Sequence, residues 1–106
     1  MDPTHIAWAA GLFEGEGCMT VDKRGSTRGL QINMTDEDII ERFRDFCGAG
    51  NITTRYEDDP VRKKQWRLRI SKRKDVIRIL SMMLPYFGQR RAYKALNILD
   101  DLELAN

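Results

Sequence analysis

The sequence predicts an α+β fold in which helices cover one face of a four-stranded antiparallel sheet. Segments with apolar residues at helical spacing alternate with pairs of short segments in which apolar and polar residues alternate. Turn-forming residues separate the two members of each pair, as in β-hairpins. The resulting order is helix, hairpin, helix, hairpin, helix (αββαββα), with a last helix after it. At 106 residues, the length suits a single domain, 1–106.

The first predicted helix runs from Thr4 to Glu14. Pro3 suits its first turn, and Gly15 and Gly17 suit its end. Its apolar residues occupy nearly the whole circumference, which predicts burial on more than one side. A chain of this size offers little to cover a second side, so we expect a partner subunit to cover it.

The four predicted strands form two hairpins. Gly25-Ser26-Thr27 is expected to turn the first hairpin, and Asp58-Asp59-Pro60 the second. Because side chains alternate along a strand, one face of the sheet receives the apolar residues and the other the polar ones. The predicted strands are Cys18–Arg24, Arg28–Met34, Asn51–Glu57 and Gln65–Ser71.

The remaining helices are predicted from an apolar stripe and a capping signal. Thr35 stands before three acids and is expected to cap the second helix, and Ser71 is expected to cap the third. Pro85 ends the third helix, and the last helix follows Gly88.

The polar face of the predicted sheet is rich in side chains that can hydrogen-bond to base edges. A major groove is wide enough to admit a two-stranded β-ribbon. The candidate DNA-binding residues are Thr20, Asp22, Arg24, Gln31, Asn33, Thr53, Arg55, Gln65, Arg67, Arg69 and, just beyond the fourth strand, Lys72.

Charge is distributed unevenly along the chain. Residues 1–60 contain six Lys/Arg and twelve Asp/Glu, whereas residues 61–106 contain twelve and four. Eight of the fourteen residues from Val61 to Lys74 are basic, which suits phosphate binding. An ordinary solvated sheet face with basic turns has the same composition, so charge alone favours a nucleic-acid partner without establishing it.

Composition also excludes several classes of protein. His5 is the only histidine, and Cys18 and Cys47 are the only cysteines, too few for a zinc finger or a histidine-rich nuclease site. The N-terminus lacks the features of a secretory signal, and no apolar stretch approaches the roughly 18 residues that span a membrane. We therefore expect no membrane association, two free thiols and a cytoplasmic location, with an organelle also open.

The segment Ala9–Gly17 (AAGLFEGEG) is unusual for a helix end. Gly11 and Gly15 leave a flat face on which a second copy of the helix could approach closely in a two-fold dimer. Glu14 and Glu16 would then converge with their copies and could bind Mg²⁺. A helix C-terminus disfavours acids, a cost that a cation would offset. Surface acids beside a glycine stop are the simpler alternative.

The same nine residues resemble the signature of the LAGLIDADG homing endonucleases. The segments INMTDEDII and PYFGQRRAYKAL, and the order of elements, also resemble single-motif members of that family. The resemblance implies a homodimer that forms a saddle over double-stranded DNA, with the motif helices at its centre. It implies cleavage of a long, pseudo-palindromic site in genomic or phage DNA, leaving short 3′ overhangs, as proteins of mobile introns do.

The resemblance also implies roles for individual residues. Glu16, the last acid of the motif, is implied to bind the catalytic Mg²⁺ or Mn²⁺. Arg90, with Arg91 beside it, is implied to assist at the scissile phosphate. The residues implied to support the motif helix and the dimer are Ala10, Gly11, Glu14 and Gly15.

The chain departs from the family pattern at a few positions. Ala9 stands where the family name has Leu, and both acids are Glu, which places each carboxylate one methylene farther from the backbone. Met34 aligns where relatives often carry a polar residue that positions water, so Asn33 or Gln31, or no residue, takes that role.

Two alternatives to a nuclease remain. The first is a non-cleaving binder of the same fold, either a transcriptional regulator or an RNA maturase that assists intron splicing. The retained acids favour the nuclease over this alternative. The second is a small interaction module with no nucleic-acid partner.

Overall fold

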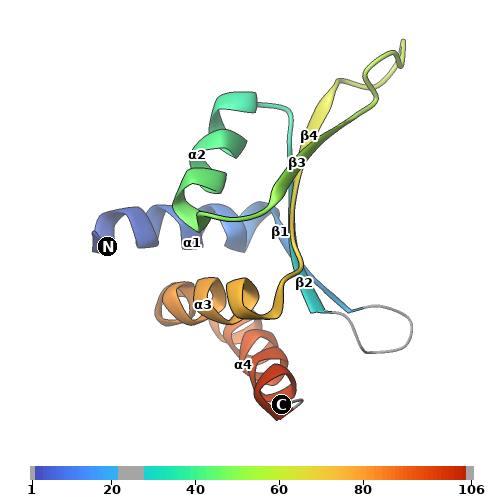
Figure 1. Cartoon of the computed structure of the whole chain (residues 1–106). Helices are drawn as coiled ribbons and strands as arrows, with labels where there is room; N and C mark the ends of the chain where they lie inside the picture. The colour runs from blue at the N-terminus through green and yellow to red at the C-terminus, as the bar shows by residue number, and fades with distance from the viewer. Residues whose placement is uncertain (1, 22–27, 105–106) are drawn as a thin grey trace.

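The computed structural model describes residues 2–21 and 28–104, and Figure 1 shows its elements in the predicted order. The four helices lie on one side of the sheet, and the opposite face of the sheet is uncovered (Figure 1). The elements are α1 (Pro3–Glu16), β1 (Gly17–Val21), β2 (Arg28–Met34), α2 (Glu37–Cys47), β3 (Asn51–Arg55), β4 (Gln65–Ile70), α3 (Arg73–Met83), the short 3-10 helix η1 (Leu84–Tyr86) and α4 (Gln89–Leu104). The α+β prediction is therefore confirmed.

The sheet has the strand order β1-β2-β4-β3, and every neighbouring pair is antiparallel. The central pair joins the two hairpins, with Leu30 opposite Ile70 and Ile32 opposite Leu68. These four side chains are at most 2% exposed and face the helices. Since side chains alternate along each strand, the residues between them face the uncovered side.

The core lies between the sheet and the helices. Phe13 of α1 is fully buried and stacks on Phe43 of α2, with 6.2 Å between ring centroids. Ala9 and Ala10 are also fully buried on the same side of α1. Close packing of this kind fixes the position of α1 relative to the sheet. It therefore also fixes the position of the C-terminal end of α1, where the motif acids lie.

The helix ends differ in part from the predictions. Asp2 caps α1 by accepting a hydrogen bond from the Thr4 N–H (2.9 Å), and Pro3 lies in the first turn as predicted. Thr35 and Ser71 are not the caps, because α2 and α3 begin one residue later than these assignments require. The N-cap positions belong to Asp36 and Lys72, and neither makes a side-chain capping hydrogen bond. The apolar stripes located these helices, but the residue at which a helix begins is less sharply defined than the helix itself.

Several predicted bounds differ from those in the structure: β1 begins at Gly17 and β4 ends at Ile70, one residue from the predicted bound in each case. The larger differences are in α1 and β3. α1 continues through Gly15 to Glu16 before it ends at Gly17. β3 ends at Arg55 because Tyr56 has a positive φ of 58°, which a strand cannot continue. Asp22 and Arg24 lie outside the described residues.

Within the described ranges, none of the helices has both the length and the apolar character needed to cross a membrane.

Candidate active site and nucleic-acid interface

The end of the motif helix leads directly into the sheet. Gly17 is both the C-cap of α1 and the first residue of β1. A side chain at Gly17 would overlap the Phe13 ring, so only glycine allows the chain to pass this closely over the core. Glu16 is therefore held at a sharp helix-to-strand junction, and its side chain is exposed.

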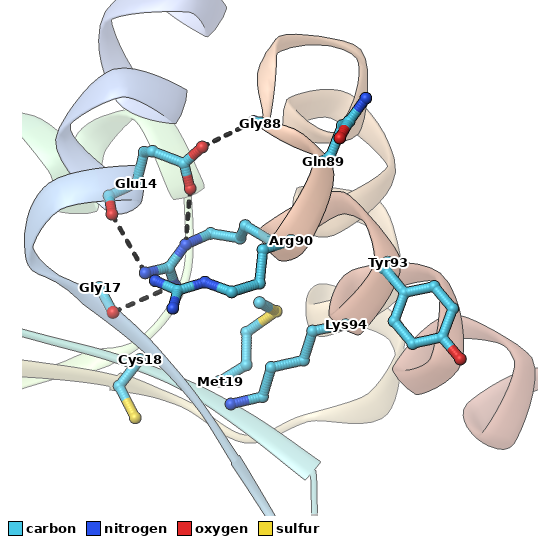
Figure 2. A pocket seen from close by; sticks show the side chains of 10 residues that line it. Glu14, Gly17, Cys18, Met19, Gly88, Gln89, Arg90, Tyr93 and Lys94 are labelled. Carbon is cyan, nitrogen blue, oxygen red and sulfur yellow. Dashed lines mark hydrogen bonds and ion pairs between the residues drawn. The ribbon is translucent and has the colours of Figure 1, made fainter.

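The two acids of the motif have different surroundings. The Glu14 carboxylate forms an ion pair with Arg91, with Oε2 2.7 Å from Nε, and its Oε1 accepts a hydrogen bond from the Gly88 N–H at 2.6 Å. Figure 2 shows these contacts joining the end of α1 to the start of α4. The Glu16 side chain makes no hydrogen bond or ion pair with any residue in the described part of the chain. Of the two carboxylates, Glu16 is the one available to a ligand.

Arg91 caps the C-terminus of α1. Its two terminal nitrogens donate to the backbone carbonyls of Glu14 (3.0 Å) and Gly17 (3.2 Å). A cation at a helix C-terminus interacts favourably with the helix dipole and with carbonyls that have no partner within the helix. An acid at a helix C-terminus interacts unfavourably with the helix dipole, and for Glu14 the cation that offsets this cost is Arg91. The sequence suggested a metal ion for this role.

A cavity of about 760 Å³ opens next to this junction. Lys94 extends along it toward Met19 and Cys18 (Figure 2). Arg90 also lines the cavity, and its exposed side chain makes no hydrogen bond with any residue that the structure describes. The cavity is lined by Glu14, Gly17, Cys18, Met19, Gly88, Gln89, Arg90, Arg91, Tyr93 and Lys94.

Lys94 was missed in the sequence analysis. It stands four residues after Arg90 in α4, so both side chains lie on one face of the helix. That spacing was the available signal, but it becomes informative only when the docked position of α4 is known. The cavity thus presents two cations with no carboxylate partner among the described residues, which suits a phosphate.

The chain by itself does not supply a complete metal site in its described residues, since no three His, Cys, Asp or Glu side chains gather there. Glu16 nevertheless fits one position of a Mg²⁺ site. Its oxygens are the hard donors that Mg²⁺ prefers, and Mg²⁺ is often held by one or two carboxylates together with substrate phosphates. The other ligands would have to come from outside this chain.

One face of α1 is uncovered. Gly11 and Gly15 are exposed, and a Cβ placed on either would have no heavy atom within 4 Å beyond its chain neighbours and the nearby backbone of its own helix. Ala10, which the sequence analysis grouped with them, is fully buried in the chain's own core. Ala10 therefore supports the helix from within, and the glycines form the outer face.

The uncovered face of the sheet carries the predicted polar residues. Cross-strand pairs place Gln31 and Asn51 on either side of Arg69, and Asn33 and Thr53 on either side of Arg67. Arg55 lies opposite Gln65 on the same face, and Thr20 lies on it in β1. Lys72 is exposed just after β4. Apart from Asp22 and Arg24, the candidate DNA-binding residues are brought together on or beside this face.

Three arginines lie close together on this face. Partial burial and the positive charges of Arg55 and Arg69 lower the pKa of Arg67, although arginine stays protonated at neutral pH. None of the three forms an ion pair with a carboxylate of the described residues. An anion on this face would relieve their mutual repulsion.

The turn between β3 and β4 is organised by residues that the sequence analysis did not single out. The guanidinium groups of Arg55 and Arg62 each lie 4.8 Å from the centre of the Tyr56 ring. The Asp59 carboxylate accepts hydrogen bonds from the N–H groups of Val61 and Arg62, which lowers the pKa of Asp59. Arg62, Lys63 and Lys64 thus lie on or next to a structured turn at the end of the sheet.

Comparison with known families decides the assignment. The model of the LAGLIDADG-like domain matches residues 4–83, about three quarters of the chain. This chain belongs to the LAGLIDADG family. No curated protein matches the sequence.

Solved structures of LAGLIDADG proteins share the fold. The homing endonuclease I-CvuI, crystallised with its target and Ca²⁺, superposes with a TM-score of 0.77 at 18% identity, over 95% of this chain and 67% of that one. The homing endonuclease I-TnaI superposes with a TM-score of 0.69 at 19% identity, over 99% of this chain and 76% of that one. I-CeuI, crystallised with DNA, superposes with a TM-score of 0.75 at 16% identity, over 97% of this chain and 56% of that one. This chain therefore spans between about half and three quarters of their lengths.

Proposed function

We propose that this LAGLIDADG chain is a site-specific DNA endonuclease that uses a divalent metal ion and acts as a homodimer. The observation that carries the proposal is the contrast at the end of α1. The Glu14 carboxylate is engaged within the chain, whereas the exposed Glu16 carboxylate has no partner among the described residues. Its neighbour Gly17 lines the cavity that Arg90 and Lys94 also line. A protein that only binds DNA gains nothing from an unpaired acid near a phosphate, because the two charges repel.

Each part of the chain has a task in this proposal. The glycine face of α1 packs against its copy, which brings two Glu16 carboxylates to one place. These carboxylates hold Mg²⁺ or Mn²⁺, which when bound supplies an activated water and stabilises the leaving oxygen of the phosphodiester. Arg90 and Lys94 bind the negatively charged scissile phosphate. The uncovered sheet faces of the two copies form the saddle that contacts the major groove.

The I-CvuI and I-CeuI structures contain their target or DNA, which supports DNA as the partner of this chain. Two copies related by a two-fold axis predict a pseudo-palindromic target. Cleavage that leaves short 3′ overhangs is part of the proposal, as is action on genomic or phage DNA inside the cell that makes the protein.

The test is a cleavage selection. The purified chain is incubated with Mg²⁺ and a library of duplexes that carry a long randomised segment, and the cut ends are sequenced. We expect a pseudo-palindromic site, cleavage that EDTA abolishes, and 3′ overhangs at the ends. Glu16→Gln should bind the selected duplex but not cut it. Glu41→Gln, an exposed acid on α2, should cut normally.

Binding without cleavage by the native chain would overturn the nuclease and favour the regulator or the maturase. Undiminished cleavage by Glu16→Gln would overturn the assignment of the metal ligand.

A further inference from the structure

Arg67 lies at the centre of the uncovered sheet face. β4 is flanked by β2 on one side and β3 on the other, and Arg67 lies opposite Asn33 and Thr53. The neighbouring arginines on this face differ from it. Arg55 turns toward Tyr56, to whose hydroxyl it donates a hydrogen bond, and Arg69 is exposed.

The guanidinium of Arg67 is held in one orientation by a side chain of the next strand. Its Nε donates to the Asn33 Oδ1 at 2.9 Å. A guanidinium is planar, so a bond at Nε leaves the two terminal nitrogens as a free fork. Those nitrogens make no hydrogen bond with any of the residues described in the structure. The fork is thus oriented in advance and has no hydrogen-bond partner among the described residues.

The ligand that fits such a fork in the middle of a DNA-binding sheet is a guanine. Guanine presents O6 and N7 side by side in the major groove, and arginine contacts both at once. Phosphates lie along the groove margins, whereas the centre of a ribbon inserted in the groove faces the base edges. We propose that Arg67, oriented by Asn33, reads one guanine in each half of the target site. This inference rests on the proposed DNA-binding function.

The experiment is a binding selection with the full-length chain. The probe is a library of duplexes with a long randomised segment, in Ca²⁺, the ion present in the I-CvuI complex with its target. We expect one guanine per half-site to be strongly selected. Replacing this guanine in one half-site should weaken binding about fivefold to a hundredfold.

Variants connect this guanine to Arg67. Arg67→Gln should lose the preference at this one base pair of each half-site, or shift it toward adenine, which glutamine can contact through N6 and N7. Asn33→Ala should broaden the preference at the same base pair, although the arginine is still present, because the fork is no longer oriented. Arg62→Gln, in the turn beyond β3, is the matched control. It should weaken all duplexes alike and leave the selected sequence unchanged. Circular dichroism spectra should match for all four proteins.

The outcomes separate the two proposals. If a site is selected but Arg67→Gln weakens every duplex equally, Arg67 contacts a phosphate and the inference is wrong. It is also wrong if the base pair that responds to Arg67→Gln is not G·C, or if Asn33→Ala acts at a different base pair. If no duplex is selected at all, the proposed DNA-binding function fails and this inference fails with it.

Discussion

Neighbouring residues of similar chemistry have different tasks in this chain, and their contacts distinguish them. Glu14 and Glu16 are two residues apart, yet only Glu14 is bound by Arg91 and Gly88. Arg90 and Arg91 are adjacent, yet only Arg91 caps α1. Sequence reasoning identified all four as candidates. It preferred Arg90 over Arg91 for the phosphate, and the contacts support that preference because Arg91 is already engaged.

Arg91→Gln should destabilise the fold more than Arg90→Gln. It removes an ion pair and two hydrogen bonds to carbonyls, and it leaves the half-buried Glu14 carboxylate with only the Gly88 N–H. Hydrogen bonds to charged groups typically contribute about 1.5–3 kcal/mol, so we expect a loss of about 2 kcal/mol in the free energy of unfolding. Urea denaturation followed by circular dichroism measures it.

Arg90→Gln is the matched control, since Arg90 is exposed and adjacent. Its free energy of unfolding should stay within about 0.5 kcal/mol of the native value, while its cleavage of the selected DNA site falls. Equal stability of the two variants would show that the Arg91 contacts contribute little.

The two cysteines should differ in reactivity. Burial raises the pKa of the Cys47 thiol to about 12, whereas Cys18 is exposed. Since the thiolate is the reactive form, iodoacetamide at pH 8 should label one thiol in the folded chain and two in urea, as counted by mass spectrometry.

The sign of the pH dependence follows from the raised pKa of Cys47. The unfolded thiol ionises near pH 9 and the folded one near 12. The contribution of the neutral thiol to stability is therefore complete below pH 9 and is lost as the pH rises from 9 toward 12. A Cys47→Ala variant should lack this component of the alkaline fall in stability. Fast labelling of Cys47 in the folded chain would contradict the assignment.

At the scale of elements, α1 has one buried side and one uncovered side. Ala9, Ala10 and Phe13 face the chain's own core, and Gly11 and Gly15 are left uncovered. A helix that is apolar nearly all round needs cover on both sides. The structure shows which side the chain itself leaves open, and cover by a second copy stays a prediction.

Gly11→Leu should therefore act on assembly and leave the fold intact. The position has open space in one chain, and leucine favours a helix by nearly 1 kcal/mol over glycine. At a close helix crossing the same side chain would force the two copies apart. We expect the dimer to dissociate at least about tenfold more readily, as measured by analytical ultracentrifugation, with an unchanged circular dichroism spectrum.

Ser81→Leu, which adds the same side chain to an exposed position on α3, should leave the dimer intact. A native chain that is monomeric at micromolar concentration and still cuts DNA fully would refute the proposed dimer.

At the scale of the whole molecule, charge and layering act together. The helices occupy one side of the sheet (Figure 1). The strand registers place Arg55, Arg67 and Arg69 on the other face, and Arg62, Lys63 and Lys64 lie in the turn between β3 and β4. A modest net charge of +2 thus coexists with one strongly basic surface. Such a surface attracts a polyanion and raises its rate of association.

DNA affinity should consequently fall steeply with salt, because each phosphate contact releases counterions. Lys63→Gln, in the basic turn, should reduce the slope of log K against log salt by about two, one phosphate for each of two copies. Arg42→Gln is the control, since Arg42 lies on α2 and stacks on Trp8. Fluorescence anisotropy measures both slopes, and an affinity that stays flat with salt would refute the basic interface.

The sequence by itself determined the order of the elements, the face on which the described strand residues lie, and the motif that contains Glu16. These features follow from local periods of 2 and 3.6 residues, from turn residues and from a contiguous signature. Only the tertiary structure decided which arginine is engaged, how Arg67 is oriented and where Lys94 contributes. The bonds concerned join residues distant in sequence: Arg67 and Asn33 are 34 positions apart, and Arg91 and the Glu14 carbonyl are 77 apart. No local pattern specifies such pairs, because they exist only when the sheet register and the docking of α4 are set.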